Sequence, residues 1–473
     1  MSDESPVPTG VLESGEFTRT SLKVRLYVMM FLQYFVQGSY LPVITVFVQD
    51  ALGFESTQIG EFKAALSVGP LLAPFIIGQI VDRHFATEKV LAFCHFVGAA
   101  LMLAIYVLSR SWSMEFYWLM VILGGLYSAL YVPSMFLTNS LTFHHLKDRD
   151  REFPRIRLWG TIGFVVPLWV VEIFFLKGLT GDELDHARGI VLLVAAVAGF
   201  VMGAYSLTLP KTPPTKTDRK DLAPGKVIGL LQSRNFLVLV LVSLLVALAH
   251  SYFFLWNSPF LRVILDRGGI QGAWEGRIAS IGQIFEVVVM AFLGFSIKRY
   301  GFKWTMAAGA TAYMVRSLIF SGVIMMDGPF ALIMTIVCVG QALHGFCFGC
   351  FLAVAYMYVD KMAPIDVRGS MQTFYGVLIV GGGIFLGGII GGEIGKVFTT
   401  SADQQSVRDS MGIDSQAGMV KIVEEQEGRK VEKLRDWTGI WLAGAAISAV
   451  ALLAFLLFFP NDKHEEKTAP HPT

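Results

Sequence analysis

Charged residues are scarce in this sequence. Asp, Glu, Lys and Arg make up 16% of its 473 residues, whereas a soluble domain carries about 25%. The charges nearly cancel, to a formal net charge of +1, and no basic block occurs. Nucleic acid is therefore excluded as an expected partner. Hydrophobic residues make up 54% of the chain, and Gly and Phe are abundant. This composition predicts a multi-pass membrane protein whose partner is the lipid bilayer.

Cysteine is also scarce, and the motifs of enzymes are missing. Two of the four cysteines, Cys347 and Cys350, form a C-x-x-C, which redox and metal sites share. No second pair follows, so we interpret them as small residues of a membrane helix. No nucleophile elbow, H-E-x-x-H or phosphate loop occurs, and the glycines of residues 376–395 indicate close helix packing. We expect no enzyme activity, no cofactor and no metal.

The chain contains many long apolar runs. A spanning helix needs about 20 mostly apolar residues, and in lipid such runs must be helical, because every backbone polar group needs a partner. Twelve segments meet this requirement. They are residues 24–49, 57–81, 87–109, 113–143, 153–176, 187–209, 235–263, 275–297, 303–325, 328–358, 366–397 and 437–459.

A polar connector after the sixth segment divides the set into two halves. The predicted fold is an all-α membrane protein with twelve transmembrane helices in two six-helix bundles. The predicted domains are a disordered cytoplasmic tail (1–20), an N-terminal bundle (21–209), a cytoplasmic linker (210–230), a C-terminal bundle (231–460) and a second cytoplasmic tail (461–473). The C-terminal bundle includes an external loop (399–436), which we expect to be a solvated insertion and partly helical.

The distribution of positive charge predicts the orientation. Loops on the side of the N-terminus are rich in basic residues, such as Arg83, Lys89, Lys147, Arg149 and Arg151. Short loops on the other side hold few Lys and Arg. The positive-inside rule then places both termini in the cytoplasm.

A weak internal repeat supports the two halves. "GQIVDRHF" follows the second segment and "GFSIKRYG" follows the eighth. Both resemble the loop motif G-x-x-x-D-R/K-x-G of the major facilitator superfamily, in which two halves rock about a midplane site. The resemblance implies a conformational latch at Gly78, Asp82, Arg83, Gly294 and Arg299.

Ionisable residues inside the apolar runs are candidates for function, because a charge at the membrane centre costs at least about 2.5 kcal/mol. Arg157, Glu286, Glu172 and Lys63 are the strongest, with His95, His250 and His344 as weaker ones. We expect Glu172 to lie at the outer interface near Lys177, Lys63 to extend toward the headgroups and His95 to be a packed core residue. For Arg157, extension to the headgroups is the alternative, and for Glu286 a structural ion pair.

Helical spacing groups some candidates on common faces. Arg157, Thr161 and Phe164 are spaced i, i+4, i+7, Gln283 and Glu286 i, i+3, and His344 and Phe348 i, i+4. Cation, carboxylate, amide and aromatic rings together suit a flat, polar, uncharged solute.

The stretch "FPRIRLWGTIGF" (residues 153–164) resembles the signature F-P-x-I-R-x-W-G-T-I-G-F of the nucleoside:proton symporter family. "FLQYFVQGSYLPV", "YVPSMFLTNSLTF", "GQIFEVVVMAFLGFSIKRYG" and "YVDKMAPIDVRGSMQ" extend the likeness over nearly all spans. The resemblance implies that six residues line the substrate cavity: Arg157, Thr161, Phe164, Gln283, Glu286 and Phe348.

The sequence departs from the family pattern at four positions. Ser251 and Phe254 replace glutamine and asparagine on the seventh helix, His344 replaces a tyrosine, and Gly349 replaces an aspartate. Ser251, Phe254 and His344 are kept as substrate-binding candidates.

The resemblance implies an importer of nucleosides in the bacterial inner membrane, coupled to protons through Glu286, Arg157 and His344, and expected to be monomeric. One alternative is a facilitator or symporter for another polar solute, such as a sugar, nucleobase or modified nucleoside. Another is a transport-dead sensor, but no cytoplasmic output domain is expected.

Overall fold

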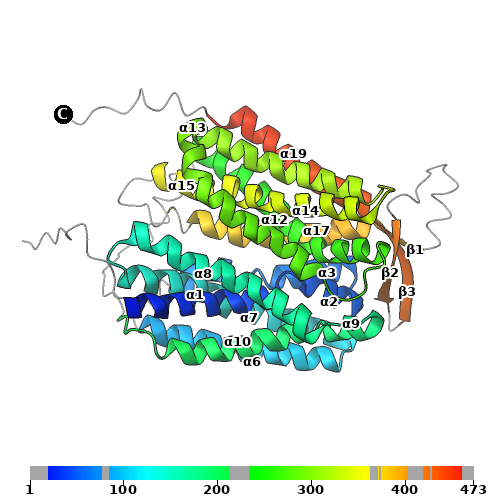
Figure 1. The fold of residues 1–473 in the computed structure, drawn as a ribbon, viewed down its shortest axis with the longest axis horizontal. Helices are drawn as coiled ribbons and strands as arrows, with labels where there is room; N and C mark the ends of the chain where they lie inside the picture. Colours follow the sequence, from blue (N-terminus) through cyan, green and yellow to red (C-terminus); the bar gives the residue numbers. More distant parts are fainter. Residues whose placement is uncertain are drawn as a thin grey trace, which may run out of the picture.

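The computed structural model describes residues 20–76, 85–213, 234–362, 371, 374–401, 419–426 and 429–460. Figure 1 shows two layers of long helices, with the first half of the chain (blue to green) in one layer and the second half (green to red) in the other. A small sheet lies at one end of both layers. The two halves predicted from the sequence are therefore the two layers of the fold.

The first half contains several broken spans. Its first span is interrupted near Pro42, where a proline cannot continue the helix, and its second span is interrupted at residues 66–68. The helices are α1 (Thr20–Tyr40), α2 (Ile44–Asp50), α3 (Ser56–Ala65), α4 (Gly69–Ile76), α6 (Thr87–Arg110), η2 (Met114–Phe116), α7 (Tyr117–His145), α8 (Arg149–Val170), η3 (Val171–Phe175), α9 (Gly181–Ala187) and α10 (Ile190–Ser206).

The second half is built from longer helices, three of which include π-helical or bent segments. Its helices are α12 (Arg234–Arg267), α13 (Glu275–Val323), α14 (Phe330–Phe346), η4 (Cys347–Ala353), α15 (Val354–Met362), η5 (Val377–Gly383), α17 (Ile384–Val397) and α19 (Trp437–Phe458). Within α13, two helices meet at Gly301, whose φ of 79° is a conformation that glycine adopts without a steric penalty.

Ten helices of the described residues are long and apolar enough to cross a membrane. One of them, α13, holds two predicted spans, and α3 with α4 corresponds to the second span, which this set of ten omits. The helices are thus consistent with twelve spans. The predicted all-α membrane fold is confirmed.

Glycines on α17 bring it close to its neighbours. A Cβ on Gly388 would lie 2.9 Å from the backbone nitrogen of Ala64 on α3, and one on Gly383 would lie 2.5 Å from the Cβ of Ala247 on α12. Real side chains do not tolerate such distances, so only glycine permits these approaches. The prediction that this glycine-rich run serves helix packing is confirmed.

The loop 399–436 folds differently from the expectation. Its described residues form β1 (Thr399–Ser401), β2 (Met419–Gln426) and β3 (Arg429–Asp436), an antiparallel sheet in the order β1-β3-β2. The expectation of partial helicity is wrong for these residues. Lys421 separates Val420 from Ile422, and Val431 lies between Lys430 and Glu432, a local period of two that suits a strand.

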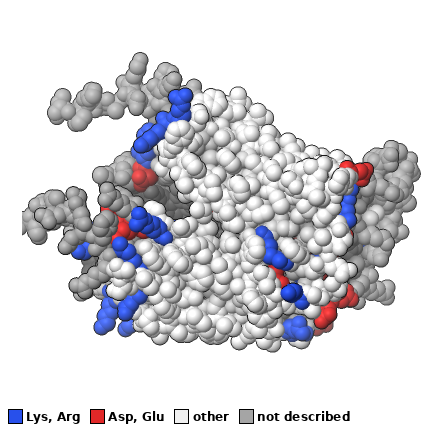
Figure 2. Space-filling view, viewed as in Figure 1, with Lys and Arg blue, Asp and Glu red and all other residues white. Residues whose placement is uncertain are grey.

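At the sheet end one apolar cluster is shared by the two halves, whereas the other apolar clusters each belong to one half. One buried cluster contains residues of both halves, including Tyr40, Phe47, Phe260 and Trp437. Two further clusters lie wholly within the second half and wholly within the first half. The space-filling view is accordingly hollowed between the halves away from the sheet (Figure 2).

Candidate functional site

Arg157 lies on α8 and packs against α1. The two helices approach closely because a Cβ on Gly163 would lie 2.2 Å from the Phe31 carbonyl oxygen. The Cζ of Arg157 lies 4.2 Å from the centroid of the Tyr34 ring, a cation–π contact. Arg157 is half-buried, whereas its neighbour Leu158 is 41% exposed. The contact with Tyr34 places Arg157 inside the bundle, which favours the site interpretation over extension to the headgroups.

Glu286 lies on α13, which contacts α8 of the other half. Arg157 is close enough to interact electrostatically with Glu286, but among the described residues no ion pair within 4.0 Å involves either side chain. Gln283, one turn earlier, is buried and makes no hydrogen bond to a described residue. The cation and the carboxylate therefore belong to opposite halves and form no ion pair.

The remaining polar-aromatic positions of the second half gather around two histidines. The His250 ring lies 5.4 Å from that of His344 and 6.1 Å from that of Phe348, between ring centroids. Phe254 meets the His344 ring edge-on at 5.4 Å. The Nδ1 of His250 is 2.8 Å from the Tyr313 hydroxyl, and Glu286 is close enough to interact with Tyr313. The rings predicted on separate helices thus form one cluster beside Glu286.

Two departures from the family pattern have local structural consequences. The Ser251 hydroxyl donates to the Ile384 carbonyl at 2.8 Å, so it links α12 to α17. A Cβ on Gly349 would lie 2.9 Å from Cγ1 of Val289, so η4 packs directly against α13. A side chain as large as aspartate at position 349 would require these helices to move apart.

Thr161 and Phe164 lie further along α8. Both are half-buried. The backbone of Phe164 packs against Gly38 of α1, where a Cβ would lie 2.1 Å from its carbonyl oxygen. Their assignment to the substrate cavity stays a prediction.

The expectation for Lys63 is wrong. Its side chain does not extend to the headgroups: it is 3% exposed, and its Nζ lies 5.8 Å from the centroid of the Phe254 ring. The reason is that α3 packs tightly against α17, through Gly60, Gly388 and Gly392. Lys63 therefore joins the same cluster from the first half.

Arg316 on α13 is a buried cation that the sequence interpretation missed. It is 1% exposed, its Nη1 is 3.1 Å from Nδ1 of His344, and its Cζ is 3.5 Å from the Phe253 ring centroid. It occupies the middle of the predicted span 303–325. The cost of burying a charge, which singled out Arg157, would also have identified it.

At the sheet end, buried charges from the two halves are paired. The carboxylate of Glu172 accepts hydrogen bonds from the Gly276 amide at 2.6 Å and from the Arg277 amide and Nε at 3.2 and 2.8 Å. Glu172 is 4% exposed, so it is packed between the two halves, and its expected place at the outer interface stays a prediction. Because Glu172 follows α8 and Gly276 lies in the first turn of α13, this contact joins the halves.

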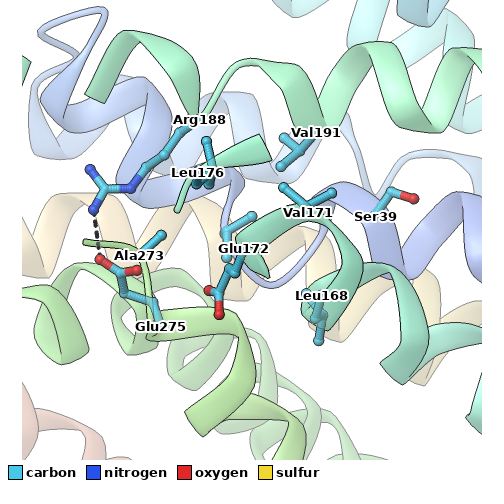
Figure 3. A pocket seen from close by; sticks show the side chains of 10 residues that line it. Ser39, Leu168, Val171, Glu172, Leu176, Arg188, Val191, Ala273 and Glu275 are labelled. Atoms are coloured by element: carbon cyan, nitrogen blue, oxygen red, sulfur yellow. Dashed lines mark hydrogen bonds and ion pairs between the residues drawn. The ribbon is translucent and has the colours of Figure 1, made fainter. Parts of the chain in front are cut away.

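Glu172 lines a small pocket between the halves, and a second charged pair, Arg188 and Glu275, lines the same pocket (Figure 3). Arg188, which precedes α10, donates from Nη2 to Oε1 of Glu275 at 2.7 Å. Both side chains are 1% exposed. Asp185 and Asp50 complete the set around Arg188. Such pairs are costly to break, because each leaves an uncompensated buried charge.

Strand β3 contributes a third contact between the halves. Arg435 is fully buried and donates to Oε1 of Gln49, to the Ser56 hydroxyl at 3.0 Å and to the Thr399 hydroxyl at 3.2 Å. Lys433 lies 3.7 Å from Glu55. The loop that looked like a solvated insertion therefore holds the two halves together.

Other expectations have mixed outcomes. His95 is packed as predicted, with Nε2 2.8 Å from Oε1 of Gln33. The four cysteines are free, and Cys347 and Cys350 are buried. Of the predicted latch, Gly78, Asp82 and Arg83 lie outside the described residues, while Gly294 and Arg299 are exposed.

Comparisons with known proteins agree with this geometry. The sequence matches the family described as "Nucleoside H+ symporter" over residues 20–464. It is 28% identical to a putative nucleoside transporter YegT of Escherichia coli, over 93% of this chain and 94% of the relative. It is 25% identical to the nucleoside permease NupG of Escherichia coli, over 93% and 96%. A xanthosine permease of the same organism is 23% identical, over 94% and 98%.

Solved structures confirm the fold. The crystal structure of the nucleoside transporter NupG superposes with a TM-score of 0.73, covering 94% of this chain and 100% of that one at 24% identity. A D-xylose–proton symporter superposes with a TM-score of 0.63, at 11% identity and over 93% and 98%. The family match covers most of the sequence. The chain is thus an integral, multi-pass membrane protein that belongs to the nucleoside H+ symporter family, whose members are transporters and not enzymes.

Proposed function

We propose that this protein imports nucleosides by alternating access and couples import to protons through Glu286. The observation that carries the proposal is the pair of opposite charges, Arg157 on α8 and Glu286 on α13, which lie on contacting helices of opposite halves and form no ion pair. A contact of this kind changes whenever the halves rock. It therefore links the charge state of Glu286 to the conformation of the protein.

The groups around Glu286 suit a nucleoside. Phe348, His344 and Phe254 offer ring faces and edges, on which a planar base can stack. The buried amide of Gln283 has no partner among the described residues, so it is available to donate to and accept from a base or a ribose. An apolar lining with a few free polar groups is typical of small-molecule sites.

Proton coupling follows from the cost of burying a charge. A carboxylate in a largely apolar site is stabilised either by a cation or by a bound proton. When Glu286 is ionised, attraction to Arg157 favours the conformation that brings the halves together there. When Glu286 is protonated, Arg157 is released to the solute. Solute and proton would thus favour the same conformation, which is how a ligand shifts a population.

The contacts at the sheet end provide one gate of the cycle. Three sets of polar contacts, at Glu172, Glu275 and Arg435, close the halves there, while the opposite end is hollowed (Figure 2). Lys and Arg gather at that opposite end, where α1 begins and α19 ends (Figure 1). By the positive-inside rule this end and both termini are cytoplasmic. We assign the conformation as inward-facing, in the bacterial inner membrane.

Uptake into proteoliposomes tests the proposal. The purified protein, expected to act as a monomer, is reconstituted, and uptake of a panel of labelled ribonucleosides is measured with an imposed pH gradient, acidic outside. We expect accumulation above the external concentration, and only equilibration once an uncoupler removes the gradient. Accumulation that survives the uncoupler would contradict the coupling, and a lack of uptake of every nucleoside would contradict the function.

A further inference from the structure

We propose that Lys63 takes up the proton from the outside and passes it to Glu286 as the sheet end closes. This inference rests on the proposed function, and it adds a second proton-carrying residue to the same site. The observation behind it is a lysine without a counter-charge that is buried exactly where the two halves meet, between the contacts of the sheet end and the ring cluster.

The burial of Lys63 depends on the contact between the halves. Lys63 lies on α3, two turns after Ser56, whose hydroxyl accepts a hydrogen bond from Arg435 at the sheet end. Helix α3 packs so closely on α17 that a Cβ on Gly60 would lie 2.5 Å from the Gly388 carbonyl oxygen. In this closed arrangement Lys63 is 3% exposed. When the halves part at the sheet end, α3 leaves α17 and α12, so Lys63 then faces the outside.

The helices that pack against α3 offer no compensation for a charge on Lys63. Within the described part of the chain, its Nζ has no carboxylate within 4.0 Å and no hydrogen-bond acceptor. His250 of α12 is the titratable side chain found to interact with it, and the Phe254 ring centroid lies 5.8 Å away. Carboxylates nearer the sheet end have other partners: Asp50 has Arg188, Glu61 has Tyr117 and Glu393 has Thr57. A buried, uncompensated ammonium group is costly, so the closed conformation favours the neutral amine.

Protonation of Lys63 and closure of the sheet end therefore oppose each other. In contact with water a lysine amine keeps its proton at any physiological pH. Closure removes that water and supplies no counter-charge. The halves consequently close at low cost only after the proton has left Lys63, so the protonated form favours the outward-open conformation and the neutral form favours the closed one.

Glu286 is the carboxylate that can receive this proton. The Nδ1 of His250 lies 2.8 Å from the Tyr313 hydroxyl, and Tyr313 interacts with Glu286, so these two residues connect the amine to the carboxylate. An N–H bond of the ammonium group breaks and an O–H bond forms on the carboxylate, which leaves a neutral amine and a neutral acid. In water this transfer is unfavourable. Away from water both charged groups lose their hydration, and the neutral pair becomes favoured where no ion pair joins them.

The two groups differ in their access to solvent, which gives the proton a direction. In the described conformation Glu286 is only half-buried, whereas Lys63 is buried. Because the sheet end is closed, we expect Glu286 to release its proton toward the hollowed end of the molecule (Figure 2). Loading at Lys63 from outside and release at Glu286 to the inside would then alternate with the rocking of the halves.

Two transport modes of the full-length protein in proteoliposomes test the inference. Lys63→Met cannot carry a proton, so uptake of a labelled nucleoside driven by a pH gradient should fall about tenfold or more. Counterflow at equal pH on both sides should stay near the wild-type rate, because Glu286 can then keep its proton throughout. The matched control is Lys396→Met, which replaces an exposed lysine at the end of α17 and should be normal in both modes.

Two further variants separate a proton carrier from a fixed charge. The guanidinium of Lys63→Arg does not lose its proton, so closure would bury a charge, and both modes should fall about tenfold or more. An imidazole has an unperturbed pKa of about 6.5. Gradient-driven uptake by Lys63→His, relative to the wild type at the same outer pH, should therefore fall as the outer pH rises through about 6.5.

The possible results separate this inference from the proposed function. Normal gradient-driven uptake in Lys63→Met, loss of counterflow in that variant once folded, or full activity in Lys63→Arg would overturn the inference, while accumulation by the wild type leaves the proposed function standing. If Lys63→Met does not fold, a Lys63→His pH profile identical to that of the wild type would overturn it. Failure of the wild type to accumulate any nucleoside would overturn the proposed function itself.

Discussion

Buried ionisable groups are paired at the sheet end of this transporter, whereas among the described residues those in its centre, Lys63, Arg157 and Arg316, form no ion pair. At the sheet end, Arg188 meets Glu275 at 2.7 Å and Arg277 meets Glu172 at 2.8 Å. In the centre, no carboxylate lies within 4.0 Å of Lys63, Arg157 or Arg316 among the described residues. Both regions join the same two halves, yet only one of them has its charges neutralised.

We propose that this difference distinguishes a gate, at the sheet end, from a binding site in the centre. Paired charges stabilise the one conformation in which they meet, and separating them is costly. Charges without partners can instead bind a solute or a proton, because no group of the protein already neutralises them. A ligand can shift a conformational equilibrium only by its different affinity for the two states. On this proposal the sheet end sets the resting conformation, and the centre responds to the substrate.

The largest effect is expected from Arg157→Ala, which removes a central cation. Uptake should fall about a hundredfold or more, since a hydrogen bond to a charged group is worth up to about 3 kcal/mol. Initial uptake rates in proteoliposomes measure this loss, with membrane expression measured in parallel. The matched control is Leu158→Ala on the same helix, at a position that is 41% exposed, which should transport normally. Normal uptake by Arg157→Ala would instead assign this arginine to the headgroups.

A smaller effect is expected from Arg435→Ala, which breaks a contact at the sheet end. Ser39 lines the pocket there and is buried. In a background without native cysteines, Ser39→Cys should react with an impermeant maleimide from outside about tenfold faster when Arg435 is replaced, because losing its hydrogen bonds costs about 1.4 kcal/mol or more of closure.

The control for that experiment is Arg110→Ala, which replaces an exposed arginine at the end of α6. It should leave the labelling rate unchanged. Equal labelling in the wild type and in Arg435→Ala would show that β3 does not hold the gate.

The smallest effect is expected from Glu172→Gln. The amide keeps one acceptor oxygen for the Gly276 amide but loses its charge and the second acceptor, which binds Arg277. Arg277 keeps its hydrogen bond to the Ala273 carbonyl and its contact with the Trp274 ring, so its charge is not left without partners. The same labelling assay should therefore show an increase of about threefold, equivalent to less than 1 kcal/mol. An effect larger than that of Arg435→Ala would reverse the order of the two contacts.

The sequence predicted the features that depend on local cost and local spacing. Arg157 and Glu286 stood out because each places a charge in an apolar run, and their helical spacing identified the face that each shares with Thr161 or Gln283. The family resemblance covers the same residues. The two-bundle fold followed from the lengths of the apolar runs and the polar connector.

The features that the sequence did not reveal depend on contacts between distant segments. Lys63 lies near the start of its span, but α17, more than 300 residues later, covers it. Glu172 lies near the end of its span, but the start of α13 supplies its donors. Arg435 reaches Gln49 across 386 positions. No local pattern encodes such partners, so their burial could not be predicted from position within a span.

The central claim is that Glu286 carries the proton that accompanies the nucleoside. A pH-sensitive dye outside proteoliposomes tests it directly, when nucleoside is added to the wild type and to Glu286→Gln. We predict alkalinisation of the external medium with the wild type, and no proton movement with Glu286→Gln although it still binds the nucleoside. Proton movement of wild-type size in Glu286→Gln would contradict the account.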